Sequence, residues 1–165
     1  MRRHTISILV ENRFGVLSRV SGLFSGRGYN IESLTVAETN DPQISRMTIV
    51  TRGEERVIEQ IDKQLNKLID VIKVMDVTSE DHVERELVLV KINAEEKNRE
   101  EILRMAEIFR GKVVDVSPKS YTVEITGSES KIQGFLEMVR PLGIQEMSRG
   151  GKVAISRGAK LLAPK

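Results

Sequence analysis

One order of apolar patterns occurs twice along this chain, and that repetition limits the possible folds more than any single motif does. Each time, a strand pattern is followed by a helix pattern, two strand patterns, a second helix pattern and a closing strand pattern. Alternating apolar and polar residues indicate a half-buried strand, whereas apolar residues three and four positions apart indicate one face of a helix. The 165 residues suit one ordinary domain or two small ones. The repetition therefore predicts two small modules of one architecture.

The first pass of the pattern ends at Val77. Its expected strands run from Thr5 to Val10, Ile31 to Glu38, Ile44 to Thr51 and Val71 to Val77, with helices from Val16 to Ser25 and from Gly53 onward. Gly26 and Gly28 end the first helix. The turn signal Asn40-Asp41-Pro42 joins the second and third strands in a hairpin. This order of elements predicts the split βαβ, or ferredoxin-like, arrangement.

A short polar linker, residues 78–82, precedes the second pass. Its expected strands run from Leu87 to Ile92, Val113 to Val116, Tyr121 to Ile125 and Ile144 to Met147, with two helices between them. Asn98 with Glu101 three residues on fits a capping box, and Ser128 can cap the fourth helix. Val153 and Ile155 can extend a sheet edge, and we expect a loose tail beyond Arg157. The predicted fold is α+β with two tandem ferredoxin-like (βαββαβ) modules, an N-terminal domain at 1–78 and a C-terminal domain with its tail at 79–165.

Modules of this size bury only a modest core. A four-stranded sheet with helices on one face leaves its other face and its edges open, and open edges invite pairing. Another copy of the chain is the simplest cover, so we expect a homodimer.

Composition narrows the class of function. Lys plus Arg is 26 and Asp plus Glu is 24, which gives no large positive field and so no indication of a nucleic-acid partner. There is no cysteine, and His4 and His82 lie far apart without nearby ligands, so a metal site is not expected. No apolar run approaches the roughly 20 residues that a membrane span needs. The strand pattern begins at once, without a signal peptide, so the expected location is the cytoplasm.

The chain also lacks motifs of catalysis. It contains no G-x-x-x-x-G-K phosphate loop, no G-x-G-x-x-G and no G-x-S-x-G nucleophile elbow. Ferredoxin-like RNA binders stack bases on exposed aromatic side chains of the sheet. Here three of the four phenylalanines, Phe24, Phe109 and Phe135, lie in helix stripes, so no aromatic platform is expected.

The segment from Asn12 to Ile31 carries the candidate site. Asn12-Arg13-Phe14-Gly15-Val16-Leu17 leads from a strand into a helix N-terminus, where free backbone N–H groups and the helix dipole favour a carboxylate. Gly15 has no Cβ, so a ligand can approach the backbone there. Asn12 offers both a donor and an acceptor, which suits an amino acid's ammonium and carboxylate. Taken alone, these residues favour an ordinary strand-to-helix turn with Asn as a turn former.

Longer sequence segments resemble those of one protein family. The first module resembles an ACT domain, the ferredoxin-like module that binds small effectors. More narrowly, Leu17-Ser18-Arg19-Val20, the run from Arg27 to Val36 and Ser45-Arg46-Met47-Thr48 resemble the regulatory small subunit of acetolactate synthase, also called acetohydroxyacid synthase. Val83-Glu84-Arg85-Glu86-Leu87, Leu89-Val90-Lys91-Ile92, Ile108-Phe109-Arg110-Gly111 and Ile155-Ser156-Arg157-Gly158 fit the same family, so the resemblance covers nearly the whole chain.

The resemblance implies a non-catalytic subunit of a branched-chain amino acid biosynthetic enzyme. Such a subunit activates a catalytic large subunit and mediates feedback inhibition by valine or another branched-chain amino acid. It carries no cofactor itself, whereas the large subunit carries thiamine diphosphate, magnesium and FAD. In similar proteins the ACT domains of two chains pair edge to edge, and the effector binds at that junction. Carried over by position, the effector-binding residues are Asn12, Gly15, Val16 and Leu17 of one chain with Asn30 and Ile31 of the other.

The second module departs from this pattern, because Asn93-Ala94-Glu95-Glu96-Lys97 has no Asn-x-x-Gly. We therefore expect no matching effector site there. Two other classes stay open: a stand-alone ACT-domain amino-acid sensor without an enzyme partner, and an RNA-binding or scaffold module. Co-purification with a large catalytic chain would decide against the first, and the absence of salt-dependent RNA binding would decide against the second.

Overall fold

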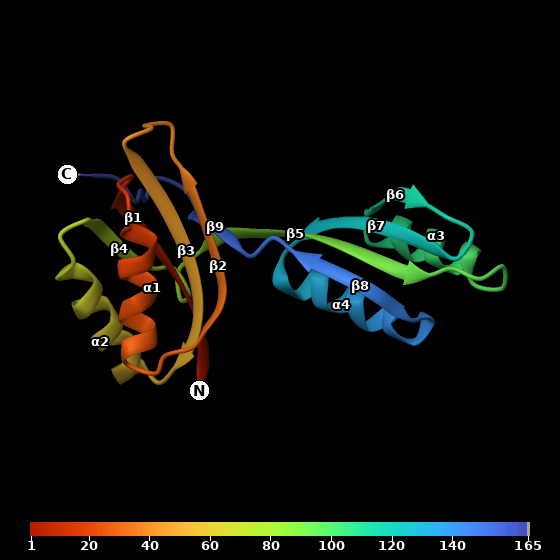
Figure 1. Cartoon of the computed structure of the whole chain (residues 1–165), viewed down its shortest axis with the longest axis horizontal. Coiled ribbons are helices and arrows are strands. Elements are labelled where there is room, and N and C mark those ends of the chain that lie inside the picture. Colours follow the sequence, from red (N-terminus) through yellow and green to blue (C-terminus); the bar gives the residue numbers. More distant parts are fainter. Residues whose placement is uncertain (165) are drawn as a thin grey trace. The chain divides into compact units, whose positions relative to one another are not determined.

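The computed structural model describes residues 1–164, which form two compact units (Figure 1). The first unit contains Met1–Val83 together with the segment that begins at Lys152, and the second contains Glu84–Gly151. The chain passes from one unit to the other within a single strand, β5 (His82–Asn93).

The first unit has the predicted order of elements. These are β1 (Arg2–Glu11), α1 (Val16–Gly26), β2 (Ile31–Glu38), β3 (Ile44–Gly53), α2 (Glu55–Asn66) and β4 (Val71–Asp76). The four strands form an antiparallel sheet in the order β2-β3-β1-β4. Gly53, expected to begin the second helix, is the last residue of β3 instead, because it pairs with Arg2 across the sheet.

Alternation along the strands places the core of the first unit on one face of its sheet. Ile6, Ile8 and Val10 of β1 pack with Met47 and Ile49 of β3 against the apolar stripes of both helices. The helix residues of this core are Val16, Val20, Leu23 and Phe24 of α1 and Ile58, Ile61 and Leu65 of α2. Both helices therefore cover the same face, and the intervening strand residues Thr5, Ser7 and Leu9 point to the other one.

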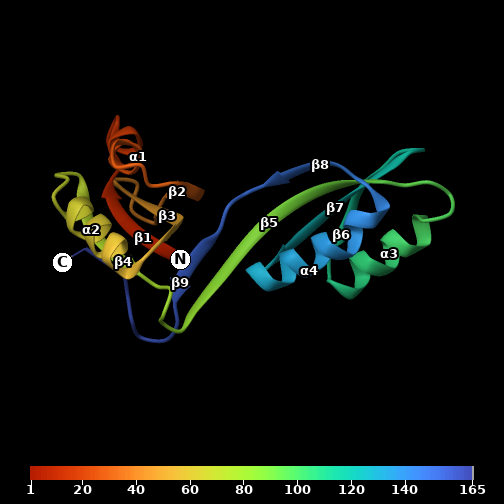
Figure 2. The ribbon, with the colours of Figure 1, turned by 90° about the horizontal axis from the view of Figure 1, so that it is seen from below.

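The second unit repeats this architecture. Its elements are β5, α3 (Arg99–Ile108), β6 (Lys112–Val116), β7 (Ser120–Gly127), α4 (Glu129–Val139), the short 3-10 helix η1 (Arg140–Leu142) and β8 (Ile144–Arg149). The strand order β6-β7-β5-β8 matches that of the first sheet, and Figure 2 shows α3 and α4 on one side of it. The prediction of an α+β chain with two ferredoxin-like modules is confirmed.

The side-chain hydrogen bonds predicted for the N-caps of two helices are wrong. Asn98 and Ser128 do occupy the N-cap positions of α3 and α4, but neither side chain makes the capping hydrogen bond to a backbone N–H of its helix. Asn98 Oδ1 accepts a hydrogen bond from Glu95 N and its Nδ2 donates to Asn93 O, so the side chain closes the preceding loop. Asn and Ser are preferred in turns as well as at caps, and here the turn prevails.

The C-terminal segment lies over the first unit, although it was expected to belong to the second. Thr35 Oγ1 donates to Lys152 O at 3.1 Å, and Lys152 N donates to Ser33 Oγ at 3.1 Å. β9 (Val153–Ser156) then pairs with β5. Past Ser156 the described residues form no helix or strand, yet Lys160 makes an ion pair with Glu80. The face of the first sheet that we expected a second copy to cover is thus partly covered by the chain itself.

Candidate functional site

The loop between β1 and α1 holds two of the six predicted effector residues, Asn12 and Gly15, and the first turn of α1 holds two more, Val16 and Leu17. Gly15 is the N-cap of α1 and has φ 82°, a left-handed conformation that side chains other than glycine's disfavour. Among residues 1–164, no side chain caps this helix, and its first turn carries no acidic residue. Val16 N donates to Arg13 O at 3.4 Å, so the N–H groups of Leu17 and Ser18 are the ones that this helix N-terminus leaves for an anion.

Asn12 is already engaged by the β2–β3 hairpin. Its Nδ2 donates to Glu38 Oε1 at 3.0 Å and to Pro42 O at 2.9 Å, and its backbone N donates to Gln43 O at 2.8 Å. Since both side-chain donors point to these oxygens, Oδ1 remains as an acceptor. In this conformation Asn12 suits an ammonium group better than a carboxylate.

The three predicted apolar residues differ in their surroundings. Val16 is only 4% exposed and belongs to the core, and Ile31 packs partly against that core. Leu17 is 45% exposed, so it is the apolar side chain of this set that a ligand or a second chain can reach most easily.

Asn30 and Ile31 lie at the opposite end of α1 from the loop. Asn30 is exposed, and its backbone O accepts a hydrogen bond from Thr51 Oγ1 at 2.7 Å. The 11 residues of α1 correspond to about 16 Å of helix. Within one chain the two groups of predicted residues therefore do not share a cavity, and a joint site requires two chains.

Two residues that the sequence did not single out complete the loop. Arg19 Nε donates to Asp70 Oδ2 at 2.8 Å, and its Nη2 donates to Phe14 O at 3.3 Å. A Cβ on Gly15 would lie 2.9 Å from Arg19 Nη1. The Arg19 guanidinium therefore lies beside the uncapped helix N-terminus, with the carboxylate of Asp70 balancing its charge. The spacing from Gly15 to Arg19 is that of helix neighbours, but nothing in the sequence links Arg19 to Asp70, 51 residues away.

A second charged group lies beside Ile31. Glu32 contacts Arg3 Nε at 2.8 Å and also accepts a hydrogen bond from Arg52. Burial raises the pKa of this carboxyl, but hydrogen bonds and charge attraction from Arg52 and Arg3 outweigh it, so the pKa lies below its ordinary value. Glu32 is therefore ionised at neutral pH.

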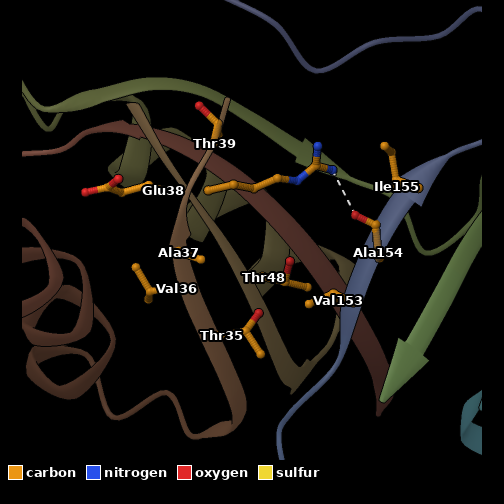
Figure 3. A pocket seen from close by; sticks show the side chains of 10 residues that line it. Thr35, Val36, Ala37, Glu38, Thr39, Thr48, Val153, Ala154 and Ile155 are labelled. Atoms are coloured by element: carbon orange, nitrogen blue, oxygen red, sulfur yellow. Dashed lines mark hydrogen bonds between the residues drawn. The ribbon is translucent and has the colours of Figure 1, made fainter. Parts of the chain in front are cut away.

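A separate pocket of about 310 Å³ lies in the first unit, and none of the six predicted residues lines it (Figure 3). Its lining comes from β2 and the following turn, from β3 and from β9: Thr35, Val36, Ala37, Glu38, Thr39, Arg46, Thr48, Val153, Ala154 and Ile155. Within the described part of the chain, there is no cluster of three or more His, Asp or Glu residues able to hold a metal. Residues 1–164 also contain no helix of sufficient length and apolarity to cross a membrane.

Comparison with known proteins shows which family the chain belongs to. Residues 6–73 match the model of the AHAS small subunit-like ACT domain, and residues 85–158 match that of the small subunit of acetolactate synthase. The probable acetolactate synthase small subunit of Methanothermobacter thermautotrophicus is 55% identical over 160 residues, covering 96% of this chain and 95% of the relative. The chain belongs to the acetolactate synthase small-subunit family.

Further members of this family also match the chain over nearly its whole length. The acetolactate synthase isozyme 3 small subunit of Escherichia coli is 53% identical over 161 residues, covering 97% of this chain and 99% of the relative. The crystal structure of the acetolactate synthase small subunit from Thermotoga maritima superposes with a TM-score of 0.87 at 41% identity, covering 97% of this chain and all of that one. The expected fold and the assignment of the first unit as an ACT domain are both confirmed.

Proposed function

We propose that this chain is the regulatory, non-catalytic small subunit of an acetolactate synthase. In this role it activates a catalytic large subunit and confers feedback inhibition by valine or another branched-chain amino acid. The observation that carries the proposal is identity above 50% to small subunits over nearly the whole length of both chains. The large subunit would supply thiamine diphosphate, magnesium and FAD, and this chain would hold no cofactor.

The geometry of the β1–α1 loop supports effector binding. The effector's carboxylate would meet the first N–H groups of α1 at Gly15 to Leu17, with Arg19 beside them. Asn12 Oδ1 would accept a hydrogen bond from the ammonium group, since the amide donors of Asn12 are engaged by Glu38 and Pro42. Leu17 would contact the branched side chain. Each methylene in such a contact is worth about 1–3 kcal/mol, so discrimination among valine, leucine and isoleucine is expected to be shallow.

A homodimer would complete the site. β2 is an edge strand of the first sheet, so its outer backbone groups can pair with β2 of a second copy. Such pairing would bring Asn30 and Ile31 of one chain toward the loop of the other, which one chain alone does not do. Light scattering that shows only a monomer at micromolar concentration would contradict this arrangement.

A reconstituted enzyme tests the proposal. Wild-type and variant chains are combined with the large subunit and assayed with and without valine. Asn12→Ala removes the acceptor for the ammonium group, a bond worth about 1.5–3 kcal/mol, so the inhibition constant should rise at least about tenfold. Gly15→Asp puts a carboxylate and a Cβ at the place of the effector's carboxylate, and it should abolish inhibition. Both variants should still activate the large subunit.

Gly22→Asp is the matched control, because it adds the same charge on α1 where a Cβ meets nothing within 4 Å. This variant should keep valine sensitivity. Wild-type sensitivity in both loop variants would place the effector site elsewhere. The isolated chain, supplied with all three cofactors, should form no acetolactate from pyruvate.

The alternative is a stand-alone ACT-domain amino-acid sensor. It would bind valine through the same loop but would have no catalytic partner. Co-purification separates the two, because only a regulatory subunit should bring down a large catalytic chain from its own cells.

A further inference from the structure

The pocket on the first sheet lies on the face that the helices leave open. The register pairs Ala37 with Arg46 and Thr35 with Thr48, while Val36 pairs with Met47 of the helix-side core. The side chains of Thr35, Ala37, Arg46 and Thr48 therefore point away from α1 and α2. β9 forms the opposite wall, with Val153 and Ile155 (Figure 3).

Arg46 brings a positive charge into this pocket. Its Nη2 donates to Ser7 Oγ at 3.2 Å and to Ala154 O at 2.9 Å, the second bond being drawn in Figure 3. Its Nε is buried and has no hydrogen-bond partner within residues 1–164, and no carboxylate of that range forms an ion pair with it. Burial lowers the pKa of the Arg46 guanidinium from its ordinary value, although arginine keeps its charge in proteins.

The partners of Arg46 differ from those of three other arginines in the first unit. Arg3 and Arg52 both pair with Glu32, and Arg19 pairs with Asp70. A half-buried guanidinium with neutral partners alone is costly to desolvate, and an incoming anion would compensate that cost. A planar guanidinium also matches a carboxylate with two parallel hydrogen bonds.

The other walls define what the carboxylate is attached to. Ala37, Val153 and Ile155 offer small aliphatic surfaces, and a volume of about 310 Å³ suits a small molecule. The carboxylate of Glu38 accepts a hydrogen bond from Asn12, and Figure 3 shows Glu38 and Val36 turned to the side of β2 away from Val153 and Ile155. Glu38 is thus the one carboxylate among the lining residues, and Asn12 already engages it, so an ammonium group of a ligand would have to compete with Asn12 for that carboxylate.

We propose that this pocket binds a short aliphatic monocarboxylate, held by Arg46 and packed against β9. The site is separate from the loop proposed for the amino-acid effector, and its ligand class lacks the ammonium group.

Calorimetric titration of the full-length chain with 3-methylbutanoate tests the proposal. Wild-type chain should show saturable binding, tighter than acetate, because the branched chain contacts the apolar walls. Arg46→Gln should weaken binding at least about tenfold through loss of the charged bonds. Ala37→Leu should weaken it similarly by filling the pocket while Arg46 stays in place.

A control variant lies on the same strand as Arg46. Arg52→Gln removes an arginine from the same face of β3 at a position outside the pocket lining. It should bind like wild type, and all variants should keep the thermal unfolding midpoint near that of wild type. Asn12→Ala should bind 3-methylbutanoate normally even where it loses the response to valine.

Several results would overturn the site. They are an absence of saturable binding by wild type, equal affinity for acetate, phosphate and 3-methylbutanoate, or unchanged binding in Arg46→Gln. Loss of binding in Asn12→Ala alone would instead assign the acid to the effector loop.

Discussion

The loops β1–α1 and β5–α3 occupy the same position in the same fold, but they use their polar groups differently. In the second unit, Asn98 is 8% exposed and bonds the backbone of Glu95 and Asn93, while Ala94 N donates to Lys119 O. The polar groups of that loop thus find hydrogen-bond partners within the second unit. In the first unit, Asn12 bonds the β2–β3 hairpin instead, and neither α1 nor α3 has a side-chain cap hydrogen bond.

Charge separates the two loops further. The first turn of α3 carries Glu100 and Glu101, which stabilise a helix N-terminus and repel an external anion. The first turn of α1 carries no acidic residue, and Arg19 lies beside it. One scaffold thus has a closed structural loop in one copy and an open, anion-favouring loop in the other. A ligand site depends on which backbone groups a loop leaves unsatisfied, and the fold alone does not determine that.

The largest expected effect on stability comes from truncating a phenylalanine in the core of one unit. Phe24 and Phe135 are each fully buried in a helix, and each has an edge-to-face aromatic partner, Tyr29 and Phe109 respectively. Phe135→Ala should cost about 3–5 kcal/mol of unfolding free energy. Amide hydrogen exchange should then rise in residues 84–151 and stay near wild type in the first unit.

Phe24→Ala is the mirror control and should raise exchange in the first unit alone. Equal loss of protection in both units after either change would show that they unfold as one.

The next effect concerns the closed loop. Asn98→Ala removes two part-buried hydrogen bonds, to Glu95 N and Asn93 O, so it should cost about 1–3 kcal/mol of unfolding free energy, measured by denaturant titration. Asn12→Ala removes bonds at the exposed surface and should change stability by about 0.5 kcal/mol or less. In the reconstituted enzyme the order should reverse, with valine response lost in the Asn12 variant and kept in the Asn98 variant. A larger stability loss at Asn12 would make that loop structural as well.

Whether the sequence predicts a feature depends on how far apart its residues lie along the chain. Strand and helix periodicities are local, so the order of elements in both units and the helix N-terminus at Gly15 could be predicted. Asn98 was assigned the wrong bonds because caps and turns favour the same residue types. The contacts of Arg46 with Ala154 and of Thr35 with Lys152 span more than 100 residues and carry no periodic signal. The expected strand at Val153 and Ile155 is present as β9, but its place in the first unit and the pocket beside it could not be predicted.

A smaller effect is expected at Gly15 itself. Gly15→Ala should cost about 1–2 kcal/mol, because the N-cap of α1 is left-handed and a Cβ would also displace the Arg19 guanidinium. The equivalent position before α3, Asn98, has φ −122° and needs no glycine. Gly22→Ala in the helix interior is the control and should stabilise by about 0.5–1 kcal/mol. Thermal unfolding of the two variants measures both changes, and equal midpoints would remove the case for strain at the loop.

The smallest effect concerns pH and should appear in the first unit only. The folded-state pKa of Glu32 lies below its ordinary value, so its pairing with Arg3 and Arg52 stabilises the fold above the unfolded-state pKa. That contribution disappears as pH falls through the folded-state pKa. Glu32→Gln should therefore lower stability by up to about 1 kcal/mol at neutral pH, the usual scale for a partly exposed pair, and by less as the solution becomes acidic. Amide exchange at β2 and β3, followed against pH in wild type and variant, measures the difference, with β5 and β7 of the second unit as the internal reference. A difference that stays constant down to acid pH would mean that Glu32 contributes through packing rather than charge, and the start of β2 would then be electrostatically neutral toward an approaching effector.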